Sequence, residues 1–291
     1  MSSWNQNKGK GAVVVTGASS GIGSATVKQL LRSGFRVFGS VRHEDDAVRL
    51  THELGQMFTP LLFDVRDEEA IQRAAAKVSA EISGQTLVGL VNNAGGAIAG
   101  PLLYQKMVDF RRQFEINVFG QFAVIQAFTP LLGSDKKRTG KPGRIVMISS
   151  TVGKFSLPFM AAYGASKHAI EGLSEGLRRE LMLFGIDVIV IGPGPVSSAF
   201  DENMRKEDQG QFLETPYAEP MSKFQNMMTK MKMLPPERIA ESIEHALTTS
   251  KPKVRYTVTA NFVSDWLVPT RLTKRLVDMS FAKQLGLLNS R

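Results

Sequence analysis

The amino-acid sequence predicts an α/β fold, in which a doubly wound parallel sheet carries helices on both faces. From residue 12 to about residue 195, continuous apolar and β-branched runs alternate with helical patterns. Strands that are apolar on both faces are typical of parallel sheets covered on both sides, and right-handed crossovers then give the doubly wound order. No repeat or low-complexity linker divides the 291 residues, so we expect a single domain over 1–291.

The first half of the predicted sheet has three strands, each followed by a helix. Each strand is a short apolar run between polar or glycine-containing segments. We expect these strands at AVVVTG (12–17), RVFGSV (36–41) and MFTPLLFDV (57–65). The helices run through Leu31, near 44–54 and over 67–82, and the third has acidic residues in its first turn, where the helix dipole favours them.

The second half of the predicted sheet has three more strands. They are LVGLVNNAG (87–95), GRIVMISS (143–150) and IDVIVIGPGP (186–195), the last of which ends at Pro-Gly-Pro. A long helical stretch over roughly 104–132, interrupted near Asn117, connects the first two of these strands. A helix that contains Tyr163 and ends at about residue 184 connects the other two.

Residues 196–235 interrupt the alternation of strands and helices. Six methionines and three phenylalanines lie in this segment. We interpret it as a substrate-covering insertion after a strand end, because methionine adapts to ligands of varied shape. Ordinary packing or contact with a second subunit is the competing interpretation.

The C-terminal extension, residues 260–291, also lies outside the alternation. Leu272, Leu276, Met279 and Lys283 recur there at helical spacing, with basic residues between apolar ones. Because a basic amphipathic helix can lie on a membrane surface, peripheral membrane contact is one interpretation. Packing over the substrate pocket or against a partner subunit is the other.

The composition narrows the kinds of function. Without cysteine, the chain has no disulfide, thiolate nucleophile or cysteine metal site, and we expect no bound metal. The start lacks the apolar core of a signal peptide, and no run reaches the roughly 20 apolar residues of a membrane span. We therefore expect a cytoplasmic protein.

The net charge of +9 is concentrated near the C-terminus. Residues 251–291 carry eight Lys and Arg against two Asp. Since no nucleic-acid-binding motif accompanies this patch, we interpret it as a solvated surface and expect no nucleic-acid partner.

Three residues form a candidate catalytic group. Tyr163 and Lys167 lie four residues apart in a predicted helix, and Ser150 lies thirteen residues before Tyr163. Because positions i and i+4 share a helix face, we expect the ammonium beside the phenol oxygen. A tyrosine pKa is about 10, and a nearby cation is expected to lower it toward the range that acid–base catalysis needs. The group is typical of proton transfer to a carbonyl.

A glycine-rich turn, TGASSGIG, connects the first strand to the first helix. Gly17, Gly21 and Gly23 let the backbone approach a pyrophosphate, and the helix N-terminus offers free N–H groups to its charge. The spacing Gly-x-x-x-Gly-x-Gly differs from the Gly-x-Gly-x-x-Gly fingerprint. Its place after the first buried strand predicts a dinucleotide site.

The residue after the second strand indicates which dinucleotide binds. An acidic residue there holds the ribose of NAD, whereas an arginine receives the 2′-phosphate of NADP. This chain has Arg42 and His43, and we assign Asp45 and Asp46 to the first turn of the next helix. A guanidinium binds phosphate in fork geometry and a carboxylate repels it, so we expect NADP(H) rather than NAD(H).

Together these elements resemble the short-chain dehydrogenase/reductase family. The matching segments, in the family's order, are TGASSGIG (16–23), FDV (63–65), NNAG (92–95), INVFG around Asn117, ISS (148–150), YGASK (163–167) and GPGPV (192–196). Gly192 and Ser198 depart from the family, since many members have Asn and Thr there. VFGSVR and the C-terminal extension resemble the hydroxysteroid and retinol dehydrogenase branch.

The resemblance implies a Rossmann fold and a role for each matching residue. Ser150 would orient the substrate oxygen, and Tyr163 would transfer the proton. Lys167 would lower the pKa of Tyr163 and bind the nicotinamide ribose, and Asn117 would hold a water in the proton relay. Beside Tyr163 and Lys167, the cofactor site would include Gly17, Ser19, Ser20, Gly21, Ile22, Gly23, Arg42, Asp64, Val65, Asn92, Ala94, Gly95, Pro193, Gly194, Val196 and Ser198.

The function expected from these features is NADP(H)-dependent interconversion of a primary or secondary alcohol and its carbonyl. The substrate would be hydrophobic, of steroid, retinoid or lipid type, and the enzyme a homodimer or homotetramer. One alternative is an NAD-dependent dehydrogenase of a smaller alcohol. Another is a non-catalytic NADP-binding sensor or scaffold, against which the complete set of Asn117, Ser150, Tyr163 and Lys167 argues.

Overall fold

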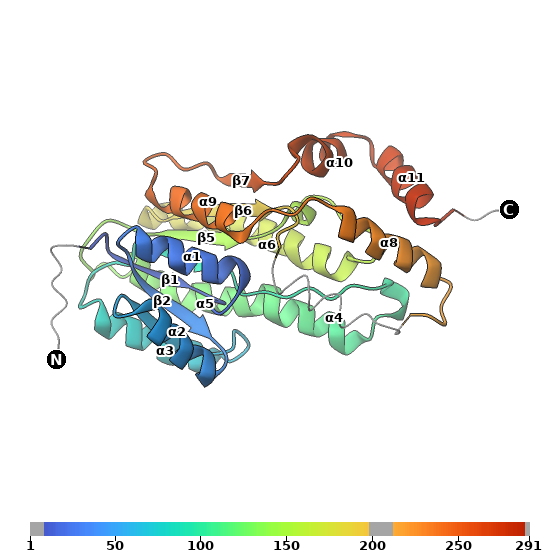
Figure 1. Ribbon diagram of the computed structural model, residues 1–291. Coiled ribbons are helices and arrows are strands. Elements are labelled where there is room, and N and C mark those ends of the chain that lie inside the picture. Colours follow the sequence, from blue (N-terminus) through green and yellow to red (C-terminus); the bar gives the residue numbers. More distant parts are fainter. Residues whose placement is uncertain (1–8, 198–211, 289–291) are drawn as a thin grey trace.

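The computed structural model describes residues 9–197 and 212–288. Its centre is a seven-stranded sheet in the order β3-β2-β1-β4-β5-β6-β7, with every neighbouring pair parallel. The strands are β1 (Ala12–Val15), β2 (Arg36–Val41), β3 (Phe58–Leu62), β4 (Gly89–Asn92), β5 (Arg144–Ile148), β6 (Asp187–Pro193) and β7 (Arg255–Val258). Helices cover both faces of the sheet (Figure 1). The predicted single-domain α/β fold with a doubly wound parallel sheet is confirmed.

One face of the sheet packs against α1 (Gly21–Arg32), α2 (Glu44–Leu54) and α9 (Pro236–Thr248). Val13 and Val15 of β1 face these helices and are fully buried. Glu44, Asp45 and Asp46 lie in the first turn of α2, which confirms the position predicted for the two aspartates. Arg42 is therefore the residue that directly follows β2, and the acidic residues belong to the next helix.

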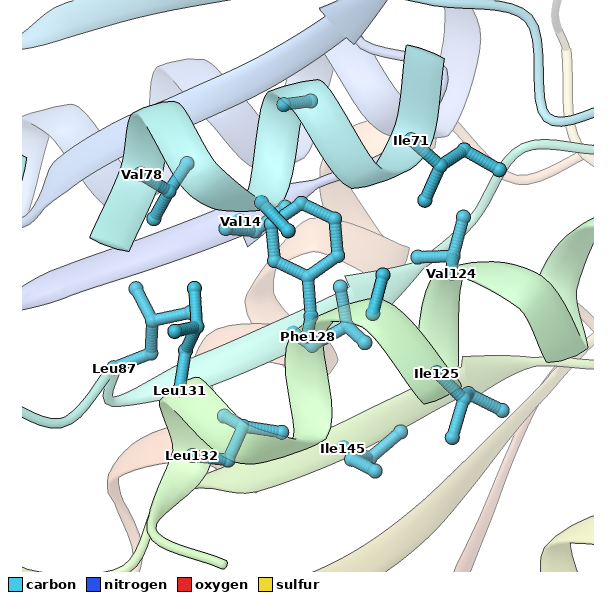
Figure 2. Close-up of a cluster of buried hydrophobic side chains, with 14 of the residues drawn as sticks. Val14, Ile71, Val78, Leu87, Val124, Ile125, Phe128, Leu131, Leu132 and Ile145 are labelled. Carbon is cyan, nitrogen blue, oxygen red and sulfur yellow. The ribbon is translucent and has the colours of Figure 1, made fainter. Parts of the chain in front are cut away.

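The other face packs against α3 (Glu68–Glu81), α5 (Gln121–Phe128) and α6 (Ala161–Glu180). Figure 2 shows Phe128 of α5 among Val14 of β1, Val78 of α3 and Leu131. Val14 alternates with its neighbours in the strand, so every residue of β1 is buried on one side or the other. This explains the continuous apolar sequence of the strand.

The helical stretch predicted over 104–132 is divided into short pieces. They are η1 (Leu102–Tyr104), α4 (Met107–Phe114), a π-helical turn η2 (Glu115–Gly120), α5 and η3 (Thr129–Leu132). The π-helical turn contains Asn117, so the predicted interruption is confirmed. A Cβ at Gly120 would lie 2.7 Å from the carbonyl oxygen of Val65, which explains the glycine at this close approach.

The sheet contains one strand that was not predicted, and several of the predicted strands are shorter than expected. Edge strand β7 was not predicted, because Arg255 and Thr257 interrupt its apolar residues and all four of its residues are only half-buried. The third strand ends at Leu62 and not at Val65. The chain turns there, since the backbone N–H of Arg66 donates to the Asp64 carboxylate at 2.9 Å.

The segments outside the alternation form further helices. The described part of the insertion contains α8 (Ala218–Lys230), and the extension contains η6 (Val263–Leu267), α10 (Val268–Arg271) and α11 (Lys274–Leu285). Figure 1 shows α8 and α11 beside each other, and Leu285 of α11 is buried in a cluster with Met221 and Phe224 of α8. Within the described ranges, no helix is long and apolar enough to cross a membrane.

Candidate active site

A cavity of about 1000 Å³ lies at the carboxyl ends of the strands, beside β1 and β4. The strand order reverses there, because β2 continues the sheet on one side of β1 and β4 continues it on the other. Open parallel sheets bind ligands at such switch points. Ligand pockets measure about 300–1,000 Å³, so the volume of this cavity lies at the upper end of the range for small-molecule and cofactor sites.

The glycine-rich turn forms one wall of the cavity. Gly17 and Gly21 have φ angles of 68° and 52°, a conformation that favours glycine. A Cβ at Gly23 would lie 1.9 Å from the carbonyl oxygen of Gly17, so no larger residue fits this turn. The first N–H groups of α1 have no partner within the helix. Together these features fit a pyrophosphate.

Asn93 fixes the shape of this turn, a role that the sequence did not reveal. Its Nδ2 donates to the carbonyl oxygens of Thr16 and Gly17, at 2.8 and 3.3 Å. The side chain of Asn92, which we predicted to line the cofactor site, is not part of the cavity lining, and its cofactor role stays a prediction. Its side chain is fully buried and donates to the carbonyl oxygen of Gln121 at 2.8 Å, because successive residues at a strand end point to opposite sides.

Two guanidinium groups line the cavity near the end of β2. Arg42 is exposed there, and Arg66, which the sequence did not indicate, binds Asp64 through Nε at 3.0 Å and through Nη2 at 2.8 Å. The side-chain hydrogen bond from Arg66 lowers the pKa of Asp64, with a smaller contribution from the charge of Arg42. Two positive charges and one negative charge therefore meet at this corner, which is positive overall and can accept a phosphate.

Ser150, Tyr163 and Lys167 line the same cavity. Ser150 follows β5, and its Oγ donates to the carbonyl oxygen of Pro193 at 3.3 Å. Lys167 is one turn after Tyr163 on α6, and its Nζ lies 5.7 Å from the tyrosine ring centroid. The same Nζ donates to the carbonyl oxygen of Ile148 at 2.8 Å. The predicted shared helix face therefore brings the ammonium, the phenol and the serine hydroxyl together.

The expectation that the pKa of Tyr163 lies below its usual value is corrected. Burial raises the pKa of Tyr163 to about 12, and only the hydrogen bond with Ser150 opposes this. Burial also lowers the pKa of Lys167 to about 8, against the attraction of Glu171. Desolvation outweighs charge proximity because both side chains are nearly inaccessible. At neutral pH the phenol is protonated and suited to donate a proton.

Asn117 belongs to a row of buried amides that holds the loop after β4. Its Oδ1 accepts from the N–H of Gly96 and its Nδ2 donates to the carbonyl oxygen of Gly96, both at 2.9 Å. Gln113, one turn earlier, accepts from the N–H of Ile98 at 2.8 Å, and Gln121, one turn later, donates to the carbonyl oxygen of Ala94 at 2.9 Å. Asn117 is thus bonded behind the cavity wall. The water-binding role stays a prediction.

Most of the predicted site residues line this one cavity. These are Gly17, Ser19, Ser20, Gly21, Ile22, Arg42, Asp64, Val65, Ala94, Gly95, Ser150, Tyr163, Lys167, Pro193, Gly194 and Val196. Gly23, Asn92 and Asn117 lie behind its wall. Ser198 lies outside the described residues.

The end of the cavity beyond the catalytic group has a largely apolar wall. Methionines of the insertion and residues of the extension contribute to it, together with residues that precede Tyr163. The apolar side chains of this wall include Phe155, Leu157, Met160, Met227, Met228, Met231, Met233, Val268, Leu272, Leu276, Val277 and Phe281. The described parts of both segments therefore border the space that a substrate would occupy. No cluster of three or more potential metal ligands occurs among the described residues.

Comparisons with known proteins agree with this geometry. A family model described as short chain dehydrogenase matches residues 11–209. The NADPH-dependent 3-dehydrocapnine reductase of Ornithobacterium rhinotracheale is 34% identical, over 94% of this chain and 96% of the relative. Retinol dehydrogenase 7 of Rattus norvegicus is 31% identical, over 84% of this chain and 79% of the relative. A solved short-chain dehydrogenase from Streptomyces avermitilis has 27% identity and a TM-score of 0.75, covering 95% of this chain and 97% of that chain.

Proposed function

Because this chain belongs to the short-chain dehydrogenase/reductase family, we propose that it is an NADP(H)-dependent oxidoreductase that interconverts a carbonyl and an alcohol. The observation that carries this proposal is one cavity lined by a glycine-rich turn, by Ser150, Tyr163 and Lys167, and by a largely apolar wall. A nicotinamide cofactor held along the turn supplies or accepts the hydride.

The side chains of the cavity perform the remaining steps. In the direction of reduction, the Tyr163 phenol donates its proton to the substrate oxygen, which the Ser150 hydroxyl orients by a hydrogen bond. Lys167, with a pKa of about 8, holds a charge beside the phenol near neutral pH. Hydrogen bonds from Gln113 and Asn117 hold the loop after β4 in one conformation, which favours productive orientation.

Arg42 supports NADP(H) over NAD(H), together with the second guanidinium of Arg66. Replacing Arg42 with glutamine is expected to weaken NADPH binding by about 10- to 100-fold, because a charge-assisted hydrogen bond contributes about 1.5–3 kcal/mol. NADH binding should be unchanged. The Kd values of both cofactors can be measured by fluorescence titration. Arg49→Gln is the control, since Arg49 is also exposed but does not line the cavity and pairs with Asp46 on α2. Equal weakening of both cofactors would contradict the assignment.

The apolar wall supports a hydrophobic substrate of lipid, steroid or retinoid type. The relatives named above as a 3-dehydrocapnine reductase and a retinol dehydrogenase agree with a substrate larger than a simple alcohol. The test is NADPH consumption with long-chain aliphatic, steroid and retinoid carbonyls beside short-chain carbonyls. We expect turnover with at least one large apolar carbonyl and little with the short ones. Tight NADPH binding without any turnover would favour a cofactor-binding sensor instead.

Peripheral contact with an anionic membrane is a further part of the proposal. Leu276 and Met279 of α11 are 58% and 47% exposed, and the exposed Arg275 and Lys283 lie one turn from Met279 on either side. Such a surface fits the interface of anionic lipid. We expect co-sedimentation with anionic vesicles but not with zwitterionic ones, and the Met279→Gln variant should bind less. Binding to neither kind of vesicle would contradict this contact.

A homo-oligomer is the last part of the proposal. Phe119, Phe122, Met182 and Leu183 are large apolar side chains with between 43% and 81% exposure, which a second copy of the chain would cover. Light scattering of the purified protein gives its mass in solution.

A further inference from the structure

Arg255 on edge strand β7 contacts the candidate catalytic group and the C-terminal extension at the same time. Its Nη2 donates to the backbone oxygen of Ser150 at 3.1 Å, and its Nε donates to the two carboxylate oxygens of Glu171 at 3.0 and 3.2 Å. Its guanidinium carbon lies 4.4 Å from the ring centroid of Trp266. Only 15% of this side chain is exposed. One arginine therefore connects the residue Ser150 after β5, helix α6 and the extension.

Glu171 places this contact next to Lys167. It lies one turn after Lys167 on α6, is 7% exposed, and also binds the ammonium of Lys154 at 3.1 Å. Its attraction raises the pKa of Lys167 against the effect of burial. A buried carboxylate persists as an ion only with such partners. Arg255 and Lys154 partly neutralise the charge of Glu171, and they therefore limit how far Glu171 raises the pKa of Lys167.

Gly192 makes room for the guanidinium. A Cβ at this position would lie 2.2 Å from the Nη2 of Arg255, so any side chain here would displace it. Gly192 is the position at which the sequence departs from the Asn of many family members. The departure has a physical reason in this chain, because Gly192 and Arg255 occupy adjacent strands and share the same space.

Trp266 connects the same arginine to the wall of the substrate cavity. It is followed by Val268 and Leu272, which line the cavity, and preceded by Asp265, which also lines it. The Asp265 carboxylate accepts a hydrogen bond from Thr259 at 2.6 Å, so the segment is also bound to the chain just after β7. A movement of this segment therefore reaches the backbone of Ser150 through a single side chain.

We propose that Arg255 is a positioning residue that holds Ser150 and α6 in register with the C-terminal extension, in a space that Gly192 leaves open. The positions of the segment that borders the substrate and of the residues that transfer the proton then depend on each other. The kinetic part of this proposal rests on the proposed function. The contact with Trp266 can be tested without any turnover.

The kinetic test uses a variant that displaces the guanidinium without removing its charge. Gly192→Ala is expected to lower kcat for a carbonyl substrate by about tenfold or more, because small misplacements of reacting groups are costly. The Kd for NADPH should stay within about twofold of the parent value. Gly176→Ala is the control, since nothing lies within 4 Å of a Cβ at Gly176 on α6. An unchanged kcat in the folded Gly192→Ala protein would overturn the proposal.

A spectroscopic test follows the extension itself. The chain has two tryptophans, Trp4 and Trp266, so the Trp4→Phe protein reports on Trp266 alone. In that background, Gly192→Ala and Arg255→Met should each shift the emission of Trp266. Arg144→Met should not, although Arg144 is 18% exposed and pairs with Asp187 in a similar way at the opposite end of the sheet. Unshifted emission in both variants would show that Arg255 does not hold the extension, whether or not the protein reduces carbonyls.

The pH profile distinguishes positioning and charge balance from simple loosening of the fold. The charged and titratable groups around this cluster include Tyr163 and Glu171 on α6, Lys154, and Arg255. Glu171→Gln removes a negative charge, so the pKa of Lys167 should fall and the alkaline limb of kcat should move to lower pH. Arg255→Met removes a positive charge, so the limb should move to higher pH. Loosening would not move the limbs in opposite directions, and shifts of the same sign would contradict the proposal.

Discussion

Replacing Tyr163 with phenylalanine is expected to lower kcat for carbonyl reduction by about 10³-fold, within the range of about 10²–10⁴ that a positioned general acid contributes. In the proposed mechanism the phenol is the group that loses its proton to the substrate, and phenylalanine keeps the ring and its packing. The Kd for NADPH should stay within about twofold, because the glycine-rich turn and Arg42 are untouched. Steady-state kinetics and a fluorescence titration of the cofactor give the two quantities.

Tyr256→Phe is the matched control for this substitution. Tyr256 is half-buried, and its hydroxyl also takes part in a hydrogen bond, which it accepts from the N–H of Lys253 at 3.0 Å, but it lies on β7 outside the cavity lining. Removing that hydroxyl should leave kcat near the parent value. A Tyr163→Phe protein that kept the parent kcat would show that another group supplies the proton. Equal losses in both variants would point to the fold and not to the chemistry.

The sequence predicted the parts of the fold that depend on local pattern. The buried strands are continuous apolar runs, and Asp45 and Asp46 fall where a helix favours acidic residues, so both could be assigned from neighbouring residues alone. Strand β7 could not be, because it is an edge strand whose Arg255 and Thr257 resemble a loop. Its pairing with β6 is decided by tertiary packing.

The candidate site divides in the same way. The four-residue spacing of Tyr163 and Lys167 places them on one helix face, and the structure has them there. The burial that dominates their pKa values depends on segments far away in the sequence and could not be inferred from spacing. Gln113 and Gln121 lie four residues before and after Asn117, and this spacing could have indicated that the three amides share one helix face. Their partners, the backbone groups of residues 94–98, were not predictable without the fold.

Replacing Lys167 with methionine is expected to abolish most of the activity without a matching loss of stability. Activity should fall by about 10²-fold or more, because the cation beside the phenol is removed. Burial lowers the pKa of Lys167 from 10.5 to about 8, which corresponds to a cost of about 3 kcal/mol for holding the charge near neutral pH. Methionine removes that cost. It also leaves the carbonyl oxygen of Ile148 without this donor, which destabilises the fold by about 1–3 kcal/mol. The variant should therefore be about as stable as the parent near neutral pH.

The difference in stability between the parent and the Lys167→Met variant is expected to depend on pH. Because the folded-state pKa is below that of the unfolded chain, the parent carries its full cost below about pH 8 and becomes more stable as pH rises from about 8 to 10.5, where only the unfolded chain still holds the proton. The methionine variant has no such gain. Urea unfolding should therefore show the parent gaining about 2–3 kcal/mol on the variant between about pH 7 and pH 10. Lys77→Met, in which an exposed lysine that donates to the carbonyl oxygen of Pro60 at 3.3 Å is removed, should show no such change. A difference that stays constant with pH would mean that Lys167 is not charged in a desolvated site, and the proton-transfer role that depends on its position beside Tyr163 would have to be reconsidered.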